Sequence, residues 1–124
     1  MIVSCGVYIF ENRRLKQAHE RYGDKLLRKI FTEDELAYAL GTAHCMERLG
    51  ARFAAKCACF QAMAWDRWRP YKEIYVVKDA LGAPRINMSE PMWTFFRQTG
   101  ATSVHLSITH IKECSLAQVI TEKI

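Results

Sequence analysis

Residues 43–63 read AHCMERLGARFAAKCACFQAM, and they carry the longest helical pattern in the chain. Apolar side chains recur there at spacings of three and four, which places them on one face of a helix: Met46, Leu49, Phe53, Cys57 and Phe60. Gly41 and Gly50 weaken the helical tendency, so we expect a break near Gly41. The stretch predicts one long helix from about Ala43 to Met63.

Outside this helix, several segments alternate with the period of a strand. Residues 2–10 (IVSCGVYIF) place Val3, Cys5, Val7 and Ile9 on one side and Ser4, Gly6, Tyr8 and Phe10 on the other. Residues 103–110 (SVHLSITH) separate Val104, Leu106 and Ile108 from His105, Ser107 and Thr109. Further strands are expected at 74–77, at 85–88 after a turn at 79–83, and at 116–121.

Shorter helices are marked by their capping residues. Asn12 is expected to cap a helix that ends at Gly23, and a short helix follows through residues 26–30. Thr32 and Glu35 form a capping-box pattern for a helix near 33–40, and Ser89 precedes a further short helix. Helices interleaved with short strands predict an α+β domain with a small antiparallel sheet and a long helix.

The chain has 124 residues, half of them apolar and a quarter charged, which is the composition of a single globular domain spanning 1–124. No apolar run approaches the roughly 20 residues that span a bilayer, and the first residues lack the pattern of a signal peptide. Five cysteines without a CxxC spacing argue against a disulfide scaffold. We therefore expect a cytoplasmic protein with no membrane partner.

Positive charge is concentrated near the start of the chain. Between Glu11 and Lys29 there are seven Lys or Arg residues against three acids, within a net charge of +5. The spacing would place four of these cations on one face if the helix were continuous, namely Arg14, Arg21, Lys25 and Arg28. Either this is a solvated helix face or it docks an acidic partner. Nucleic acid is a weaker candidate than an acidic protein.

Two further groups of residues admit both a structural and a chemical interpretation. The polar face made of His105, Ser107 and Thr109, with His110 just beyond it, is either an exposed sheet face or the lining of a phosphate or nucleotide site. Cys57 and Cys59 diverge by about 200° on a helix, so they cannot share one metal and are by default buried, inert thiols. A nucleophilic pair of Cys57 and His105 requires a fold that brings them together.

Taken together, several stretches resemble the holo-acyl-carrier-protein synthase type of 4′-phosphopantetheinyl transferase. They follow in the family's order over nearly the whole chain: Gly6–Ile9, Arg13-Arg14, Ile30–Leu36, Ala51–Lys56, Gly82–Pro84 and Val104–His110. The Phe-Ala-Ala-Lys segment at 53–56, followed by the histidine-containing strand, is the most specific pairing.

The resemblance implies a small α+β subunit that assembles as a homotrimer, with coenzyme A as donor and an acyl carrier protein as partner. It implies that the cations at 14–28 meet the acidic carrier protein. It also implies that residues near the coenzyme A or pantetheine group come from three parts of the chain: Arg52 and Lys56, Pro84, and the strand that bears His105, Ser107 and His110.

Three positions depart from the family's pattern. The resemblance implies carboxylates, which hold Mg²⁺, at the positions of Tyr8 and Cys57, and a lysine at Gln61. The glycine-threonine loop after the long helix is replaced by Ala64–Trp68. A phenol is neutral near pH 7, and a thiol is a soft ligand that magnesium does not select. We therefore expect no metal-binding residues in this chain.

Three hypotheses about function follow. The first is a repurposed family member that acts on a carrier-protein-bound acyl or polyketide thioester in fatty-acid or polyketide-type biosynthesis, with Tyr8, His105 and Cys57 as candidate acid, base or nucleophile. The second is an active transferase from coenzyme A to apo carrier protein with a relocated Mg²⁺ ligand. The third is a non-catalytic module that binds carrier proteins.

Overall fold

The computed structural model describes residues 1–124 and forms an α+β fold, as the patterns predict. The elements in chain order are β1 (Ile2–Glu11), α1 (Asn12–Tyr22), α2 (Asp24–Ile30), α3 (Glu33–Ala39), α4 (Cys45–Ala62), a 3₁₀ turn (Tyr71–Glu73), β2 (Ile74–Lys78), β3 (Pro84–Met88), α5 (Glu90–Gln98), β4 (Ser103–His110) and β5 (Cys114–Glu122). None of the helices is both long and apolar enough to cross a membrane.

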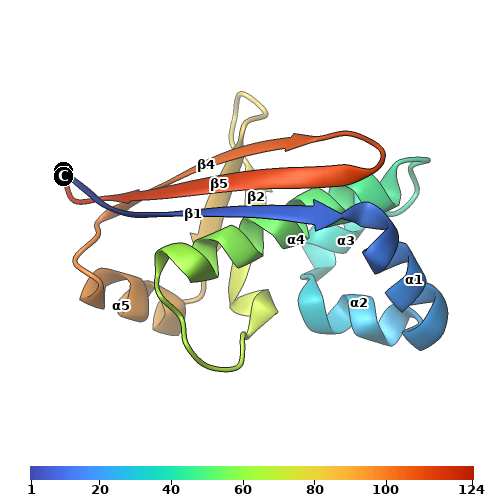
Figure 1. Ribbon diagram of the computed structural model, residues 1–124, viewed down its shortest axis with the longest axis horizontal. Coiled ribbons are helices and arrows are strands. Elements are labelled where there is room, and N and C mark those ends of the chain that lie inside the picture. Colours follow the sequence, from blue (N-terminus) through green and yellow to red (C-terminus); the bar gives the residue numbers. More distant parts are fainter.

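The main sheet has three antiparallel strands in the order β1-β5-β4, and α4 lies along one of its faces (Figure 1). The pairing places Tyr8 opposite Ala117 and His105 opposite Ile120. The hairpin of β2 and β3 lies on the other side of α4, while α1, α2 and α3 gather near one end of that helix. The two chain ends meet, since the amide of Lys123 donates to the carbonyl of Met1 at 2.8 Å.

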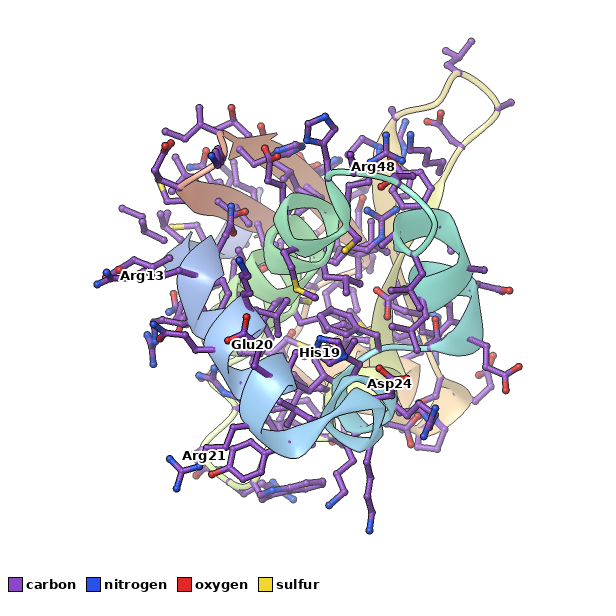
Figure 2. The ribbon with its side chains drawn as sticks, turned by 90° about the vertical axis from the view of Figure 1, so that its right-hand side faces the viewer. Arg13, His19, Glu20, Arg21, Asp24 and Arg48 are labelled. Atoms are coloured by element: carbon purple, nitrogen blue, oxygen red, sulfur yellow. The ribbon has the colours of Figure 1, made fainter.

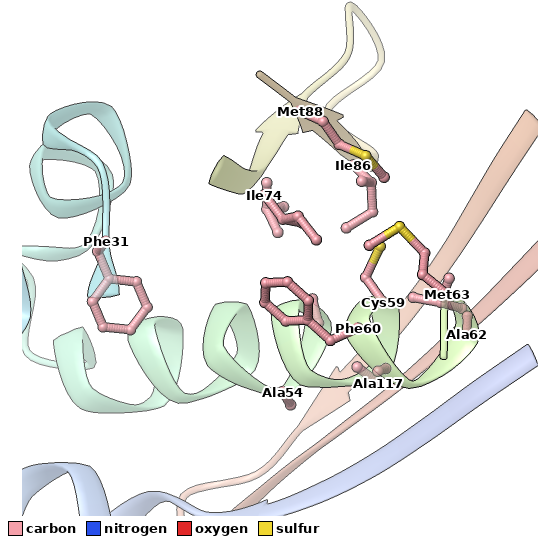
Figure 3. Packing of buried hydrophobic residues seen from close by; sticks show 14 of the residues in the cluster. Phe31, Ala54, Cys59, Phe60, Ala62, Met63, Ile74, Ile86, Met88 and Ala117 are labelled. Atoms are coloured by element: carbon pink, nitrogen blue, oxygen red, sulfur yellow. The ribbon is translucent and has the colours of Figure 1, made fainter. Parts of the chain in front are cut away.

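The core is built on both sides of α4. Small residues, among them Ala54 and Ala58, face the sheet, and Phe60, Cys59 and Met63 face the β2–β3 hairpin with Ile74, Ile86 and Met88 (Figure 3). Gly6 allows the close approach of α4 to β1, because a Cβ on Gly6 would overlap the carbonyl oxygen of Ala58. The sheet-facing side of α4 therefore has to be made of small side chains.

The face of β1 that is buried is not the one that hydrophobicity alone predicts. Gly6 and Phe10 are buried against α4 and Tyr8 is half-buried, whereas Val7 and Ile9 are 48% and 69% exposed. The outer face of the sheet therefore carries apolar side chains without a covering layer in this chain. The inner face needs a glycine where the helix comes closest, which explains why the less apolar side is buried.

Asn12 does not act as the predicted helix cap. It is the first residue of α1, its side chain is buried, and Glu11 holds the capping position without a side-chain hydrogen bond. The Asn12 amide instead donates to the carbonyls of Ile111 and Lys112 at 3.1 and 3.2 Å and accepts from the Ser115 hydroxyl at 2.8 Å. Asn12 thus joins the start of α1 to the β4–β5 turn, which is a long-range contact that a local pattern cannot predict.

Candidate functional site

Helix α4 positions two groups of polar side chains on either side of a buried ion pair. The Lys56 ammonium donates to Glu35 Oε1 at 2.8 Å and to the carbonyls of Tyr71 and Ile74 at 2.9 and 2.6 Å. The other carboxylate oxygen of Glu35 accepts from the amide of Val76 at 3.1 Å. Lys56 and Glu35 are at most 1% exposed, so this pair fastens α4 to α3 and β2.

The ion pair changes the expected position of Lys56. The resemblance implies that Lys56 lies near the coenzyme A phosphates or the reacting centre, but in this chain its ammonium is enclosed and already has three acceptors. Burial lowers the pKa of Lys56, and the neighbouring Glu35 carboxylate opposes that shift. Lys56 is therefore a structural anchor between the two groups of side chains.

The first group, which we call the basic pocket, surrounds the ring of Tyr38 on α3. Three cations lie over that ring: Arg52 at 3.9 Å, Lys78 at 4.5 Å and Arg48 at 4.9 Å from its centroid. They line a pocket of about 380 Å³ together with Gly82, Pro84 and His110. Cations from α4 and from the end of β2 therefore converge on one concave surface.

The electrostatics of the basic pocket favour an anionic ligand. The Arg52 side chain is 7% exposed, and its Nε is buried without a hydrogen-bond partner. Burial lowers the pKa of Arg52, while a hydrogen bond to Lys78 lowers the pKa of the Tyr38 hydroxyl. An unpaired buried guanidinium N–H is costly, and a phosphate oxygen is the acceptor that suits it best.

An acid limits the charge at the rim of this pocket. Glu47 lies 2.9 Å from His44 Nδ1 and 3.6 Å from His110 Nδ1. Arg48 follows Glu47 in the first turn of α4, and its side chain is labelled in Figure 2. The carboxylate is thus engaged by histidines, and the three cations around Tyr38 define the interior of the pocket.

The second group, which we call the aromatic–thiol cluster, lies where α4 meets β1 and the segment after α4. It consists of Tyr8, Cys57, Arg69 and Tyr71. The ring of Phe53 packs against two of these side chains: its centroid lies 6.3 Å from that of the Tyr8 ring and 5.4 Å from that of the Tyr71 ring. Burial raises the pKa values of Cys57 and Tyr71, the charge of Arg69 acts against that effect, and the Tyr8 hydroxyl also acts on Cys57.

The cluster contains neutral donors and a fixed cation. Burial raises the pKa of Cys57 to about 11, with the nearby Arg69 charge acting in the opposite direction. Burial likewise raises the pKa of Tyr8, and the charges of Arg14 and Arg69 oppose that shift. Both side chains are therefore protonated near neutral pH. A neutral phenol and a neutral thiol beside a guanidinium do not fit Mg²⁺, which requires anionic oxygen ligands.

Gln61 lies one turn after Cys57 on α4. Its side-chain oxygen accepts from the backbone amide of Val7 at 3.2 Å. Gln61 is thus used to join α4 to β1, next to Tyr8. The amide supplies no charge to the cluster, whose neighbouring cations are Arg14 and Arg69.

His105 does not join Cys57, so the hypothesis of a nucleophilic pair within one chain is wrong. His105 points away from α4, and its Nε2 lies 2.9 Å from Glu122 Oε1 and 3.4 Å from the Ser103 hydroxyl. Strand alternation explains the separation, because Val104 and Leu106 take the core side of β4. Ser107 shares the outer face and does not line the basic pocket.

The predicted docking cations are exposed but do not form one continuous helical face. Gly23 adopts φ 74°, which ends α1 and begins α2 at a new angle. His19 Nε2 and Asp24 Oδ1 meet at 2.7 Å across this junction, while Arg13 and Arg21 project outward from α1 (Figure 2). Arg14 and Arg21 lie on α1, and Lys25 and Arg28 lie on α2. The break at Gly23 divides the basic surface into two short faces.

Several residues of these sites were not identified from the sequence: Tyr38, Arg48, Lys78, Arg69 and Tyr71. Arg48 lies four residues before Arg52, and that same-face spacing of two arginines is a signal that could have been used. Arg69 and Tyr71 follow the altered loop at 64–68. Their position depends on how the loop returns to α4, which no local pattern encodes.

No family model matches the chain. Among curated proteins, the holo-[acyl-carrier-protein] synthase of Solibacter usitatus is 35% identical over 124 residues, covering 98% of this chain and 99% of that protein. The holo-[acyl-carrier-protein] synthase of Carboxydothermus hydrogenoformans is 36% identical over 115 residues, covering 92% and 93%.

Solved structures agree with these relatives. The crystal structure of holo-[acyl-carrier-protein] synthase from Neisseria meningitidis superposes with a TM-score of 0.89 at 27% identity and covers 99% of this chain and 100% of that one. A holo-(acyl-carrier-protein) synthase from Bacillus anthracis, in complex with CoA (3′,5′-ADP), gives a TM-score of 0.79 at 32% identity over 100% and 99% of the chains. Sequence and fold agree along the full length, and the chain belongs to the holo-acyl-carrier-protein synthase family.

Proposed function

We propose that the chain transfers the 4′-phosphopantetheine group from coenzyme A to an apo acyl carrier protein. Family membership supports this activity over a repurposed one, which reverses the order of the first two hypotheses drawn from the sequence. The observation that carries the proposal is the basic pocket, which is lined by Arg48, Lys78 and Arg52, the last with a buried Nε that has no hydrogen-bond partner.

The basic pocket suits the nucleotide end of coenzyme A. Two guanidinium groups and an ammonium can bind phosphate oxygens, with Arg52 offering a preorganised N–H in a desolvated place. Of the residues expected at this ligand, Arg52, Pro84 and His110 line the same pocket. Lys56 acts indirectly, by holding α4 against β2 so that Arg52 and Lys78 stay close.

The exposed cations of α1 and α2 form the proposed docking surface for the carrier protein. Arg14 contributes from the edge nearest the aromatic–thiol cluster, since its charge acts on the Tyr8 hydroxyl. An acidic carrier protein bound across Arg14, Arg21, Lys25 and Arg28 would therefore present its acceptor group beside that cluster.

A homotrimer is part of the proposal. The outer face of the sheet exposes Val7, Ile9 and Leu116, an apolar surface that packing between copies would cover. His105 and Ser107 lie on the same face and would then be at subunit boundaries. Light scattering coupled to size exclusion should report three copies, and Val7→Lys should shift the protein to monomer. A wild-type monomer would remove this part of the proposal.

The transfer itself is tested by mass spectrometry of an apo carrier protein incubated with coenzyme A and the protein. We expect the mass of a phosphopantetheine group to be added, and we expect Arg52→Gln to slow its appearance. Arg97→Gln is a matched control, because it removes an exposed guanidinium at the end of α5, away from the pocket. Binding of carrier protein without any mass change would favour the non-catalytic module.

A second candidate function is action on a carrier-protein-bound acyl thioester. The observation that favours it is the proximity of Tyr8 and Cys57, which influence each other's pKa and place two proton-bearing groups where the resemblance implies metal-binding carboxylates. Acyl-loaded carrier protein is the discriminating substrate: a chemical change in the acyl chain that is lost in Tyr8→Phe would support this function over transfer.

A further inference from the structure

The aromatic–thiol cluster combines positive charge with neutral hydrogen-bond donors. Its fixed charge is the guanidinium of Arg69, which lies 5.6 Å from the centroid of the Phe60 ring and whose charge acts on both Cys57 and Tyr71. The charge of Arg14 also acts on the cluster, at Tyr8. The remaining polar groups are two phenols and a thiol, which can donate hydrogen bonds to an anionic oxygen.

Arg69 is held in place by its surroundings. Its guanidinium rests on Phe60, an enclosed residue of α4, and the preceding segment is anchored by Trp65, whose ring packs 4.7 Å from Phe95 and 5.7 Å from Phe60. The indole Nε1 of Trp65 donates to the carbonyl of Trp68 at 3.0 Å, which closes the turn just before Arg69. A preorganised guanidinium loses little conformational freedom when it binds an oxyanion.

The cluster is also accessible. Tyr8, Arg69 and Tyr71 are half-buried, so solvent reaches them, whereas Cys57 is buried. Arg69 forms no salt bridge with a carboxylate. A guanidinium without an acidic partner, beside neutral hydrogen-bond donors, is complementary to a phosphate group.

We propose that Arg69, supported by Tyr8 and Tyr71, binds a phosphate or diphosphate group directly and replaces the divalent cation that the fold family implies at this position. The inference rests on the proposed function in one respect, since the diphosphate concerned is that of coenzyme A. A guanidinium neutralises phosphate charge and fixes its orientation through two N–H groups. Binding at this site is therefore independent of magnesium.

The experiment uses inorganic pyrophosphate as the probe and calorimetry as the readout, with EDTA in one series and Mg²⁺ in the other. Wild-type protein is expected to bind pyrophosphate in EDTA, and Arg69→Gln and Arg69→Met are expected to weaken binding by about tenfold to a hundredfold. Arg69→Met retains the aliphatic contact with Phe60 and so separates loss of charge from loss of packing. Thermal unfolding verifies that each variant is folded.

Arg67→Gln is the matched control. Arg67 belongs to the same segment but lies over Trp65 and near Asp66, at 4.9 Å from the ring centroid and 3.7 Å from the carboxylate. Its loss should change pyrophosphate affinity less than twofold. The inference is overturned if pyrophosphate binds only with Mg²⁺, if it does not bind, or if Arg69 variants bind as tightly as Arg67→Gln. A loss confined to Arg52→Gln overturns it too, because the anion then occupies the basic pocket.

The result is separable from that of the proposed function. Pyrophosphate binding through Arg69 together with no pantetheine transfer would retain the anion site and reject the transferase. Transfer that requires Mg²⁺ and is unaffected by Arg69→Met would retain the transferase and reject the anion site.

Discussion

The basic pocket and the aromatic–thiol cluster flank the same buried ion pair on α4, yet they relate differently to the family. In the pocket, Arg52, Pro84 and His110, which the resemblance implies at coenzyme A or pantetheine, line one concave surface. In the cluster, a phenol and a thiol occupy positions where the resemblance implies carboxylates, and the guanidinium of Arg69 comes from the segment after α4. The comparison teaches that one side of α4 keeps the residue types that the resemblance implies, whereas the other side has neutral groups and a cation in place of acids.

Lys56→Met tests whether the two regions depend on one anchor. Removing the ammonium leaves the Glu35 carboxylate buried without its charge partner, so the free energy of unfolding should fall by about 3–5 kcal/mol. Urea unfolding followed by tryptophan fluorescence measures the change. The double variant Lys56→Met, Glu35→Gln should recover part of the loss, because it removes the unpaired charge. A cost below about 1 kcal/mol would mean that the pair does not anchor α4.

Carboxylates introduced into the aromatic–thiol cluster should make pantetheine transfer depend on Mg²⁺. The variant Tyr8→Asp, Cys57→Glu, Gln61→Lys is expected to require Mg²⁺ and to transfer pantetheine about 10²–10³ times faster than wild type with the metal present. The isosteric variant Tyr8→Asn, Cys57→Gln, Gln61→Lys lacks the negative charges and should gain nothing. Product mass over time gives both rates. Equal rates in the two variants would show that anionic oxygen is not what the cluster lacks.

Sequence patterns predicted most of the scaffold, because the scaffold depends on local periodicity. The long helix at Cys45–Ala62, the strand at Ser103–His110 and the capping box of Thr32 and Glu35 all lie within a few residues of their expected places. Asn12 was misassigned as a cap because its partners, Ile111 and Lys112, are distant in sequence. Local spacing cannot reveal such a contact.

The sites were predicted less completely for the same reason. Arg52 was identified from a motif, and its partners Tyr38 and Lys78 come from α3 and β2, which only the fold brings together. Arg69 follows the loop at 64–68, which departs from the pattern that the resemblance implies, so neither resemblance nor periodicity pointed to it. A pair of His105 and Cys57 depended on the fold, and strand alternation places His105 on the face of the sheet that points away from α4.

Cysteine labelling tests whether the cluster is a nucleophilic centre. Burial raises the pKa of Cys57 from 9.0 to about 11, so its thiolate fraction at pH 8 is about a hundredfold below that of an unperturbed thiol. Iodoacetamide should therefore modify exposed Cys5 first, and the rate at Cys57 should rise with pH until about pH 11. Peptide mass spectrometry resolves the two sites, and Cys57→Ser identifies the slow one. Rapid labelling of Cys57 at pH 7 would instead favour the acyl-thioester hypothesis.

Arg52→Gln and Arg69→Met should differ in which ligands they affect, which tests the basic pocket and the aromatic–thiol cluster separately. Calorimetry should show weaker binding of both coenzyme A and 3′,5′-ADP, by about tenfold to a hundredfold, because the desolvated guanidinium loses its charge-assisted bonds to phosphate. Arg69→Met should weaken coenzyme A alone, since 3′,5′-ADP has no diphosphate. Arg97→Gln should affect neither ligand.

Stability distinguishes a binding role of Arg52 from a structural one. The guanidinium is stabilised by its position 3.9 Å above Tyr38, but it is also buried with an unpaired Nε, and these contributions oppose each other. Arg52→Gln should therefore change the free energy of unfolding by less than about 1 kcal/mol while affinity falls. A large loss of stability would make Arg52 part of the scaffold, like Lys56. Lost affinity at unchanged stability would mean that its unpaired N–H is kept for the ligand.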